Sequence, residues 1–278
     1  MNSFYAVVVV YNSEVTESQT CTNIEQISGH NVNLIVVDNS TKDNSNKAIC
    51  ADKGWKYISM NGNAGLSKAY NKVLCILEGE EGIIIWFDDD TNVTQDYFDM
   101  LEKAVDEHQE CDVFTPLIQG QDGRFWSPNE YRFFRNKQLK EISQQISDDR
   151  FNAINSCTAV RLGVYKNYRY DERLFLDQVD HSFFESQREE HRKFLKLDVL
   201  IQHNFSTKSK MQDLNAVKNR YSIMIPDFLT FCSRDKKKYL LGLVKVCGWG
   251  IRESIKYKEP TFIAWCMSEA FKHHTNAK

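Results

Sequence analysis

The stretch "GIIIWFDDDTNV" (residues 82–93) joins an apolar run to three consecutive aspartates, Asp88, Asp89 and Asp90. Its first six residues predict a strand buried on both faces, because parallel strands covered by helices are hydrophobic along nearly their whole length. Two carboxylates ~4 Å apart repel by about 4 kcal/mol at an effective dielectric of 20, and by roughly 1 kcal/mol in water. An exposed acidic turn would tolerate the triplet, whereas a cleft would require a compensating cation.

The composition is that of an ordinary globular protein. The chain has 278 residues, of which 42% are hydrophobic and 26% charged, so it is long enough for one large domain or a domain with an appendage. The net charge of -3 gives no basic field, and we expect no nucleic-acid partner. Eight scattered cysteines without a CxxC pair indicate reduced structural thiols in a cytoplasmic protein, not a zinc site.

No segment predicts a signal peptide or a membrane span. The N-terminal apolar run lacks a preceding basic region and is too short for a signal sequence. The later run "YLLGLVKVCGWGI" (239–251) contains Lys245 and falls short of the ~20 residues that cross a bilayer. We therefore expect a cytoplasmic protein, with peripheral attachment to the inner face of the cell membrane as an alternative.

Strands and helices alternate through the first 108 residues. The predicted strands are "FYAVVVV" (4–10), "VNLIVVDNST" (32–41), "WKYISM" (55–60) and "GIIIWF" (82–87), and the predicted helices lie within 11–27, 43–53, 61–77 and 94–108. This alternation is typical of a parallel α/β sheet. Tyr11, Asp38 and the aspartate triplet each follow a strand end, so we expect them to share the crevice beyond the carboxyl edge of the sheet.

The second half of the chain is more varied. It predicts a strand at 111–119, irregular or hairpin structure at 120–136, one or two strands within 151–168, and a segment 169–191 that ends in a helix. A further strand at 193–207 has His203 near its end. From about residue 207 onward the pattern is helical, with Pro226 and Pro260 as expected helix breaks.

Several chemistries are possible for an acidic crevice. Neither G-x-G-x-x-G nor the P-loop spacing is present, and a D-x-D-x-T match starting at Asp88 fails because Asn92 stands in the fifth place. Mg²⁺ or Mn²⁺ fits better, because these hard cations bind carboxylates together with substrate phosphate oxygens.

The motifs "VVVVYN", "LIVVDNST", "NGNAGLSKAYN", "WFDDDT", "RLFLDQVDHSFF" and "IQHNFS" resemble, in their order, family 2 glycosyltransferases with the GT-A fold. More narrowly they resemble the bacterial rhamnosyl- and galactofuranosyltransferase branch. The resemblance covers roughly residues 4–205. It implies a Rossmann-like, mostly parallel sheet flanked by helices in a domain at 1–206, with a donor half at about 1–118 and an acceptor half at about 119–206. Residues 207–278 would form a helical C-terminal extension.

The resemblance also implies roles for individual residues. The implied donor-binding residues are Tyr11, Asp38, Asn63, Gly65, Lys68, Asn71, Asp88 and Asp89, and the implied ligands of Mn²⁺ or Mg²⁺ are Asp88, Asp90 and His203. An alternative for His203 is a strand-end histidine bonded to backbone. The general base would be Asp180, with Asp177 as the alternative because the two would share a face if a helix opens here. Relatives commonly have an acidic residue where this chain has Ser182.

Two regions are candidates for further contacts. Segments 126–134 and 155–160 would line the acceptor site, with Trp126 and Tyr131 stacking on sugar rings, although either ring would also suit a core. The segment "SRDKKKYLLGLVKVCGWGIRESIKYK" (233–258) mixes basic and apolar residues, as an interfacial helix on an anionic membrane does. Packing on the main domain and a homodimer contact are the alternatives.

These observations predict a metal-dependent, inverting glycosyltransferase. It would move a hexose, such as rhamnose or galactofuranose, from a UDP- or dTDP-sugar to a saccharide or lipid-linked saccharide. The resemblance implies that its product belongs to a bacterial surface polysaccharide, a capsule or O-antigen. A nucleotidyl or phosphoryl transferase with the same acidic crevice, and a non-catalytic sugar-nucleotide-binding module, are the alternatives.

Overall fold

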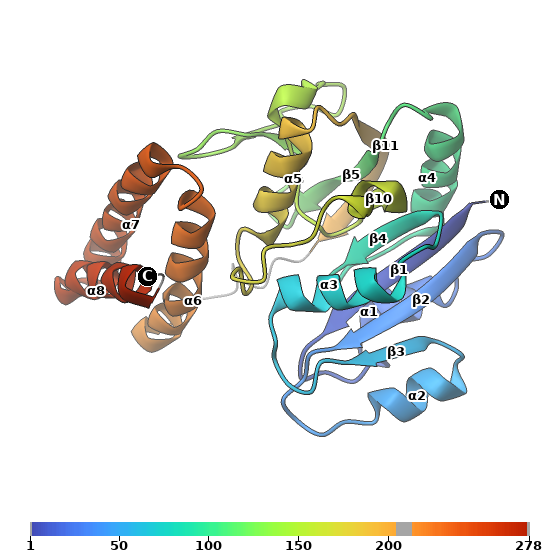
Figure 1. Ribbon diagram of the computed structural model, residues 1–278, viewed down its shortest axis with the longest axis horizontal. Coiled ribbons are helices and arrows are strands. Elements are labelled where there is room, and N and C mark those ends of the chain that lie inside the picture. The colour runs from blue at the N-terminus through green and yellow to red at the C-terminus, as the bar shows by residue number, and fades with distance from the viewer. Residues whose placement is uncertain (1, 204–212, 277–278) are drawn as a thin grey trace.

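The computed structural model describes the backbone of residues 2–203 and 213–276. Within these residues the centre is an eight-stranded sheet of order β11-β5-β10-β4-β1-β2-β3, with β6 paired to β5 (Figure 1). Its strands are β1 (Ser3–Val10), β2 (Asn31–Asp38), β3 (Lys56–Ser59), β4 (Ile83–Phe87), β5 (Val113–Gly120), β6 (Phe125–Ser127), β10 (Thr158–Arg161) and β11 (Phe194–His203). A small second sheet contains β7 (Asn129–Glu130), β8 (Lys137–Gln138) and β9 (Phe151–Asn152).

The direction of the strands brings polar chain ends to one edge of the sheet. β1 runs parallel to β2 and β4, β2 runs parallel to β3, and β11 runs parallel to β5. β10 is antiparallel to both β4 and β5, so the residues just before β10 lie at the edge where β4 ends. The mostly parallel α/β architecture predicted from the sequence is confirmed.

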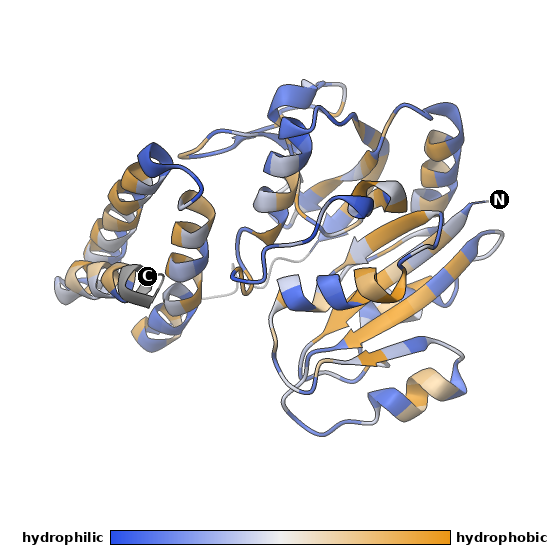
Figure 2. Ribbon diagram, viewed as in Figure 1, coloured by the Kyte–Doolittle hydropathy of each residue, from blue (hydrophilic) through white to orange (hydrophobic). Residues whose placement is uncertain are grey.

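Helices cover both faces of this sheet. The helices of this part of the chain are α1 (Gln19–Ile24), α2 (Asn46–Asp52), α3 (Leu66–Ile76), α4 (Gln95–Glu107) and α5 (Val179–Glu189). Three C-terminal helices follow: α6 (Leu214–Cys232), α7 (Lys236–Tyr257) and α8 (Thr261–Asn276). Alternate residues of β4 enter different cores: Trp86 packs with Tyr70 of α3, whereas Phe87 packs on the opposite face with Tyr97 of α4. Burial on both faces explains why β1 and β4 are hydrophobic along most of their length in Figure 2.

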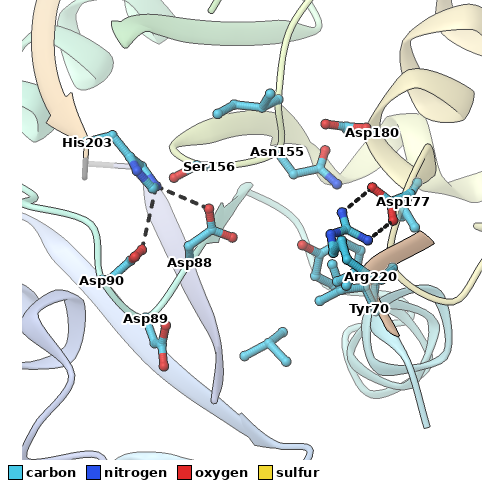
Figure 3. Close-up of a pocket in the computed structure, with 15 residues that line it drawn as sticks. Tyr70, Asp88, Asp89, Asp90, Asn155, Ser156, Asp177, Asp180, His203 and Arg220 are labelled. Carbon is cyan, nitrogen blue, oxygen red and sulfur yellow. Dashed lines mark hydrogen bonds and ion pairs between the residues drawn. The ribbon is translucent and has the colours of Figure 1, made fainter. Parts of the chain in front are cut away.

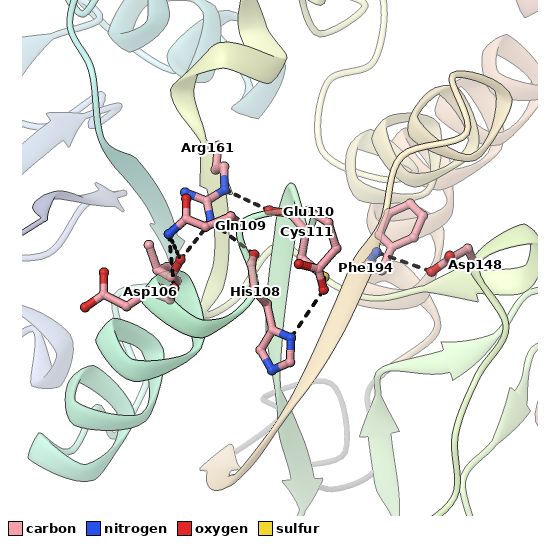
Figure 4. Close-up of polar contacts among 9 residues, drawn as sticks. Asp106, His108, Gln109, Glu110, Cys111, Asp148, Arg161 and Phe194 are labelled. Carbon is pink, nitrogen blue, oxygen red and sulfur yellow. Dashed lines mark hydrogen bonds and ion pairs between the residues drawn. The ribbon is translucent and has the colours of Figure 1, made fainter.

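Arg161 at the end of β10 holds the C-terminal end of α4 against the sheet. Its guanidinium donates to the carbonyl oxygens of Cys111 at 2.7 Å, Val105 at 2.9 Å and His108 at 3.2 Å (Figure 4). The last carbonyls of a helix have no partner within the helix, and a cation there also opposes the negative end of its dipole. Arg161 thus fixes the helix that follows the acidic loop.

The three C-terminal helices pack together beside the main sheet (Figure 1). The expected break at Pro226 is wrong, because α6 continues through this proline, whereas Pro260 does separate α7 from α8. A proline inside a helix costs about 3 kcal/mol. The burial of Ile225, Phe228 and Leu229 around it offsets that cost. None of the described helices is long and apolar enough to cross a membrane.

Two helix boundaries also differ from the sequence-based expectation. The helix expected within 11–27 is limited to α1, because Val15, Ser18 and their neighbours form turns before it. The helix α5 begins at Val179, so Asp177 lies outside it and the expected helix face shared with Asp180 is wrong. The reason is Gln178, whose φ of 64° is left-handed and ends the preceding loop instead of extending the helix.

Candidate active site

A cavity of about 740 Å³ opens at the carboxyl edge of the sheet. It is lined by Val9, Leu66, Tyr70, Asp88, Asp89, Asp90, Ile154, Asn155, Ser156, Leu176, Asp177, Val179, Asp180, His203 and Arg220. These residues come from strand ends β1, β4 and β11, from α3, α5 and α6, and from the loops before β10 and α5. A crevice is therefore present at the expected edge of the sheet, but of the three polar strand ends only the aspartate triplet lines it.

Asp88, Asp90 and His203 form an acidic group on one side of this cavity. His203 Nε2 lies 3.3 Å from Asp88 Oδ2 and 3.6 Å from Asp90 Oδ1 (Figure 3). One ligand atom from each residue lies within 4.8 Å of the others. Burial alone would lower the pKa of the buried His203 ring, but the attraction of Asp88 and Asp90 outweighs it and raises that pKa. The two carboxylates thus create a field that favours a positive charge at this point.

The donor atoms of this group suit a divalent cation. Two carboxylates are ligands that Mg²⁺ and Mn²⁺ both accept. The imidazole favours Mn²⁺, because Mg²⁺ prefers an octahedron of oxygen atoms. The residues present therefore fit the cation that the sequence predicted.

Asp89, between these two aspartates, points away from His203 (Figure 3). Its Oδ2 accepts a hydrogen bond from Ser13 at 3.2 Å, and its pKa is raised by burial and by its two acidic neighbours. The backbone of the triplet is held by α1: Ser18 Oγ donates to the carbonyl oxygen of Asp89 at 2.8 Å, and Thr20 Oγ1 to that of Asp88 at 2.6 Å. These bonds keep alternate side chains on opposite sides of the loop.

Asp180 lies across the cavity from this acidic group, beside Asn155 (Figure 3). It is in the first turn of α5, where Oδ1 accepts a hydrogen bond from the backbone N–H of His181 at 2.7 Å. Burial raises its pKa, more than the nearby His181 lowers it. A carboxylate with a raised pKa is a better proton acceptor than an ordinary one, which suits a general base.

Asp177 is occupied by a partner. Both of its oxygens accept hydrogen bonds from the guanidinium of Arg220 on α6, with Nη2 2.6 Å from Oδ1. The loop around it is held by Asp227, whose carboxylate accepts the backbone N–H groups of Phe175 at 2.9 Å, Leu176 at 2.8 Å and Asp177 at 2.7 Å. The C-terminal extension therefore builds part of the cavity wall.

Tyr70, which lines the cavity, belongs to a buried aromatic cluster. Tyr70 packs on Trp86 with ring centroids 4.2 Å apart, and Trp86 Nε1 donates to the hydroxyl of Tyr165 at 2.8 Å. Burial raises the pKa of Tyr70 well above its usual value, so its hydroxyl stays protonated. Asn155 and Ser156, from the segment 155–160 expected near the acceptor, do line the cavity.

Three of the predicted donor residues shape the chain around α3. Asn63 Oδ1 accepts hydrogen bonds from Asn39 and Gly65. Gly65 has a φ of 87°, and a Cβ there would lie 2.7 Å from Phe175, so only glycine fits between α3 and the 175–177 loop. Asn71 is 8% exposed and binds the backbone of Tyr170 through both its amide nitrogen and its oxygen.

The other predicted contact residues lie outside the main cavity. Lys68 is exposed on α3 and Tyr11 is 51% exposed, and neither lines the cavity. Asp38 borders a second hollow of about 420 Å³. Burial would raise the pKa of Asp38, but hydrogen bonds from Ser40 and nearby asparagines outweigh this and lower it. The donor-binding roles of these residues stay predictions.

Trp126 and Tyr131 are also outside the cavity. Trp126 Nε1 donates to Asp122 Oδ1 at 3.1 Å. The ring of Tyr131 lies under the guanidinium of Arg188, 4.6 Å from its centroid, and borders a separate hollow. Their predicted contact with the acceptor is not tested by this geometry.

Sequence reasoning missed Arg220 and Asp227. Both are on α6, and they reach Asp177 across 43 and 50 positions of sequence. The only available signal was an arginine and an aspartate seven positions apart, two helical turns, on a helix whose only other charged residue is Lys218.

The sheet order and the cavity at its carboxyl edge, with the Asp88/Asp90/His203 group, define a GT-A-like α/β protein. The family model described as "Glycosyl transferase family 2" matches residues 5–169. Because that match spans more than half of the chain, the protein belongs to glycosyl transferase family 2 and is a glycosyltransferase. The narrower branch predicted from the motifs is not tested by this match. No curated protein sequence matches the chain.

Solved structures of glycosyltransferases share the fold. TarS from S. aureus, in complex with UDP, has a TM-score of 0.54 at 15% identity, covering 98% of this chain and 88% of that one. The mannosyltransferase PcManGT from Pyrobaculum calidifontis, with GDP-Man and Mn²⁺, has a TM-score of 0.59 at 12% identity, covering 100% and 88%. Glucosyl-3-phosphoglycerate synthase from Mycobacterium tuberculosis, with Mn²⁺, UDP and phosphoglyceric acid, has a TM-score of 0.55 at 12% identity, covering 84% and 78%.

Proposed function

We propose that this protein is a metal-dependent, inverting glycosyltransferase that takes a hexose from a nucleoside-diphosphate sugar. One observation carries the proposal: two carboxylates grouped with an imidazole face a carboxylate with a raised pKa across one cavity. The similar structures that hold UDP, or GDP-Man with Mn²⁺, support the choice of donor. A UDP- or dTDP-sugar is the donor class that the motifs favour.

The acidic group would hold Mn²⁺ or Mg²⁺ through Asp88, Asp90 and His203. A cation bound there supplies the positive charge that stabilises the departing diphosphate. Asp89 points to the other side of the loop, towards Ser13, and is available to the nucleoside part of the donor. The aspartate triplet is thus divided between two tasks by the alternation of its side chains.

Asp180 would accept the proton of the attacking acceptor hydroxyl. As that proton leaves, the hydroxyl oxygen forms the new bond to the anomeric carbon while the bond to the diphosphate oxygen breaks on the opposite face. The configuration inverts in this single displacement, and no covalent intermediate with the chain is needed. Asp177 is less suited to this role, because Arg220 already binds both of its oxygens.

The acceptor we propose is a saccharide, free or lipid-linked, that enters beside Asn155 and Ser156. The finer assignment to rhamnosyl or galactofuranosyl transfer in bacterial capsule or O-antigen synthesis is supported by the motif resemblance alone. A lipid-linked acceptor would bring the protein to the inner face of a membrane, and the C-terminal helices are the part of the chain predicted to make that contact.

A panel of nucleotide sugars with Mn²⁺ or Mg²⁺ tests the proposal. We expect one UDP- or dTDP-sugar to raise the melting temperature in the presence of the metal and to release its nucleoside diphosphate when an acceptor is added. NMR of the product should show an anomeric configuration opposite to that of the donor. Retained configuration would contradict the mechanism. Turnover of a nucleoside triphosphate without a sugar acceptor would support a nucleotidyl transferase instead.

The variant Asp180→Asn separates an enzyme from a binding module. It should bind the donor as the parent protein does, because Asp180 faces the acceptor side, and it should lose transfer by about 10²- to 10⁴-fold. If neither the parent protein nor the variant turns over any donor that both bind, the protein would be a sugar-nucleotide-binding module.

A further inference from the structure

The helix α7 exposes a row of large apolar side chains. Of the eleven exposed large hydrophobic residues among those that the structure describes, five lie on this one helix. They are Leu240, Leu241, Val244, Ile251 and Ile255, with exposed fractions of up to 76% for Ile255. Positions 240, 244, 251 and 255 follow a spacing of four and seven, which places them on one face of a helix.

The opposite face of α7 is used for packing. Gly242, Val246, Gly250 and Glu253 are its buried residues. A Cβ on Gly250 would lie 2.9 Å from the backbone of Ile263, so α7 and α8 are in close contact there. The exposed row therefore lies on a helix whose other face is well packed. It faces away from the helices that contact α7.

The exposed charges on α7 itself have one sign. The exposed charged residues of α7, a helix described along its whole length, are Lys236, Lys237, Arg252 and Lys256. Its acidic residue Glu253 is 5% exposed and accepts hydrogen bonds from Tyr221 and Arg252. Glu253 also lies 3.8 Å from Lys256, so Arg252 and Lys256 are both paired within this helix. Lys236 and Lys237 form no ion pair with any residue in the described part of the chain. This helix face is cationic although the chain as a whole has a net charge of -3.

We propose that this α7 face is a docking surface for an anionic phospholipid bilayer. An amphipathic helix lies in the bilayer interface when its apolar side enters the acyl boundary and its lysines and arginines meet anionic headgroups. A second copy of the chain fits less well. In a two-fold contact the same surface meets itself, so the cations of α7 would face cations in either relative direction of the two helices.

A bilayer bound to α7 would lie to one side of the candidate active site and would not cover its opening. In Figure 1 α7 and α8 are on the far side of α6 from the main sheet, and α6 contributes Arg220 to the cavity wall. Docking through α7 would hold the protein at a membrane while its cavity stays open to the donor in solution. The surface does not depend on the donor chemistry, so vesicle binding and glycosyl transfer can fail separately.

Co-sedimentation of the full chain with vesicles tests this surface. We expect binding to phosphatidylcholine vesicles that contain phosphatidylglycerol, weaker binding at high salt, and little binding to phosphatidylcholine alone. Lys236→Glu with Lys237→Glu should lower the partition coefficient on the order of 30-fold, since each lysine contributes separately. Both positions are in the first turn of α7, where glutamate is compatible with the helix dipole. Lys72→Glu with Lys103→Glu, exposed on α3 and α4, changes the net charge equally and should bind like the parent.

The apolar part of the surface needs its own variant. Ile251→Gln with Ile255→Gln keeps good helix formers on exposed positions and should reduce binding tenfold or more. Ile142→Gln, at an exposed site whose carbonyl accepts a hydrogen bond from Lys196 of β11, is the control and should have no effect. Equal binding of the parent protein to neutral and anionic vesicles would overturn the proposal. A loss of vesicle binding in Lys72→Glu with Lys103→Glu as large as that in Lys236→Glu with Lys237→Glu would overturn it as well. So would a concentration-dependent dimer that Ile251→Gln with Ile255→Gln dissociates, which would assign the face to a second copy.

Discussion

Arg220 of α6 and Asp177 of the loop before α5 form a bidentate ion pair inside the candidate active site. The pairing raises the pKa of Arg220, so its guanidinium is charged at any working pH. The side chain of Asp177 is 17% exposed and that of Arg220 35% exposed, so water screens the pair only in part. A helix from outside the sheet domain thus neutralises one of the two aspartates that the sequence left as candidates for the base.

The ion pair predicts different results for the two aspartates. Asp177→Asn should keep transfer within about tenfold of the parent, because this carboxylate is bound to Arg220 and is not free to accept a proton. It should still lower the free energy of unfolding by about 1–3 kcal/mol, the usual contribution of hydrogen bonds between charged groups. Steady-state kinetics beside Asp180→Asn measures the difference, and urea unfolding measures the stability.

A double-mutant cycle checks that the two residues act through each other. Arg220→Met should be destabilising alone, and its effect should shrink in the Asp177→Asn background. If Asp177→Asn loses as much transfer as Asp180→Asn while the fold is retained, Asp177 would be the base.

The second prediction concerns the pH dependence of Asp180. Burial raises the pKa of Asp180 above its ordinary value of 3.8, so the folded state binds a proton more tightly than the unfolded state. The ionised form therefore destabilises the fold at neutral pH, and this penalty disappears as the pH falls below both pKa values. Asp180→Asn should melt at a higher temperature than the parent at pH 7, and the difference should shrink as the pH falls and vanish only below the unfolded pKa of 3.8.

The pH profile of the reaction follows from the same shift. kcat/KM should fall on the acid side around the raised pKa of Asp180, because only the carboxylate accepts the proton of the acceptor. A variant no more stable than the parent at pH 7, together with an acid limb at the value of an ordinary aspartate, would argue against a buried base at this position.

The third prediction uses the alternation within the aspartate triplet. Asp88→Asn and Asp90→Asn should each weaken Mn²⁺ binding strongly, because both face His203, whereas Asp89→Asn should leave metal binding nearly unchanged because Asp89 binds Ser13 on the other side. Calorimetric titration of Mn²⁺ into each protein, without donor, measures this directly. Equal losses in all three variants would show that total negative charge, not the arrangement of ligands, governs the affinity.

The parts of this site that the sequence predicted are those built locally. Burial on both faces makes β1, β2 and β4 hydrophobic runs, and a parallel sheet places their polar ends at one edge, so the aspartate triplet could be assigned to a crevice. His203 was placed near the end of a further strand in the same way, but its role as a metal ligand was implied by the family resemblance. These inferences need only the hydrophobic pattern of one segment and the direction of the neighbouring strands.

The parts that the sequence did not predict depend on packing between distant segments. No residue near Asp177 in the sequence indicates its ion pair with Arg220. Gln178, whose left-handed backbone excludes Asp177 from α5, is not a glycine, so the sequence did not indicate a break there. Pro226 predicts a helix break because proline has a low helix propensity. The helix nevertheless continues through it because its neighbours are buried. Tertiary contacts overrode local preference at each of these positions.

The fourth prediction concerns Asp227, the buried carboxylate that holds the loop in front of α5. It is 2% exposed and accepts three backbone N–H groups, from Phe175, Leu176 and Asp177. The same loop contacts the start of α3, where Leu66 donates its N–H to the carbonyl oxygen of Phe175 at 2.7 Å. One carboxylate therefore sets the distance between the donor side and the acceptor side of the cavity. Asp227→Asn replaces one acceptor oxygen by a donor, so at least one buried N–H loses its partner.

We expect Asp227→Asn to lower the free energy of unfolding by about 1–3 kcal/mol and to reduce kcat more than the KM for the donor. We expect kcat to change more than KM because the loop leads into Asp180, the proposed base. The substitution does not alter the Asp88/Asp90/His203 group on the other side of the cavity. Asp213→Asn is the matched control: Asp213 is the N-cap of the same helix, with its carboxylate on the backbone N–H of Ala216 at 2.7 Å, and asparagine caps nearly as well. Kinetics well below the melting temperature of each variant separate positioning from unfolding. If kcat is unchanged while stability falls, Asp227 supports only the fold, and the link from α6 to Asp180 fails.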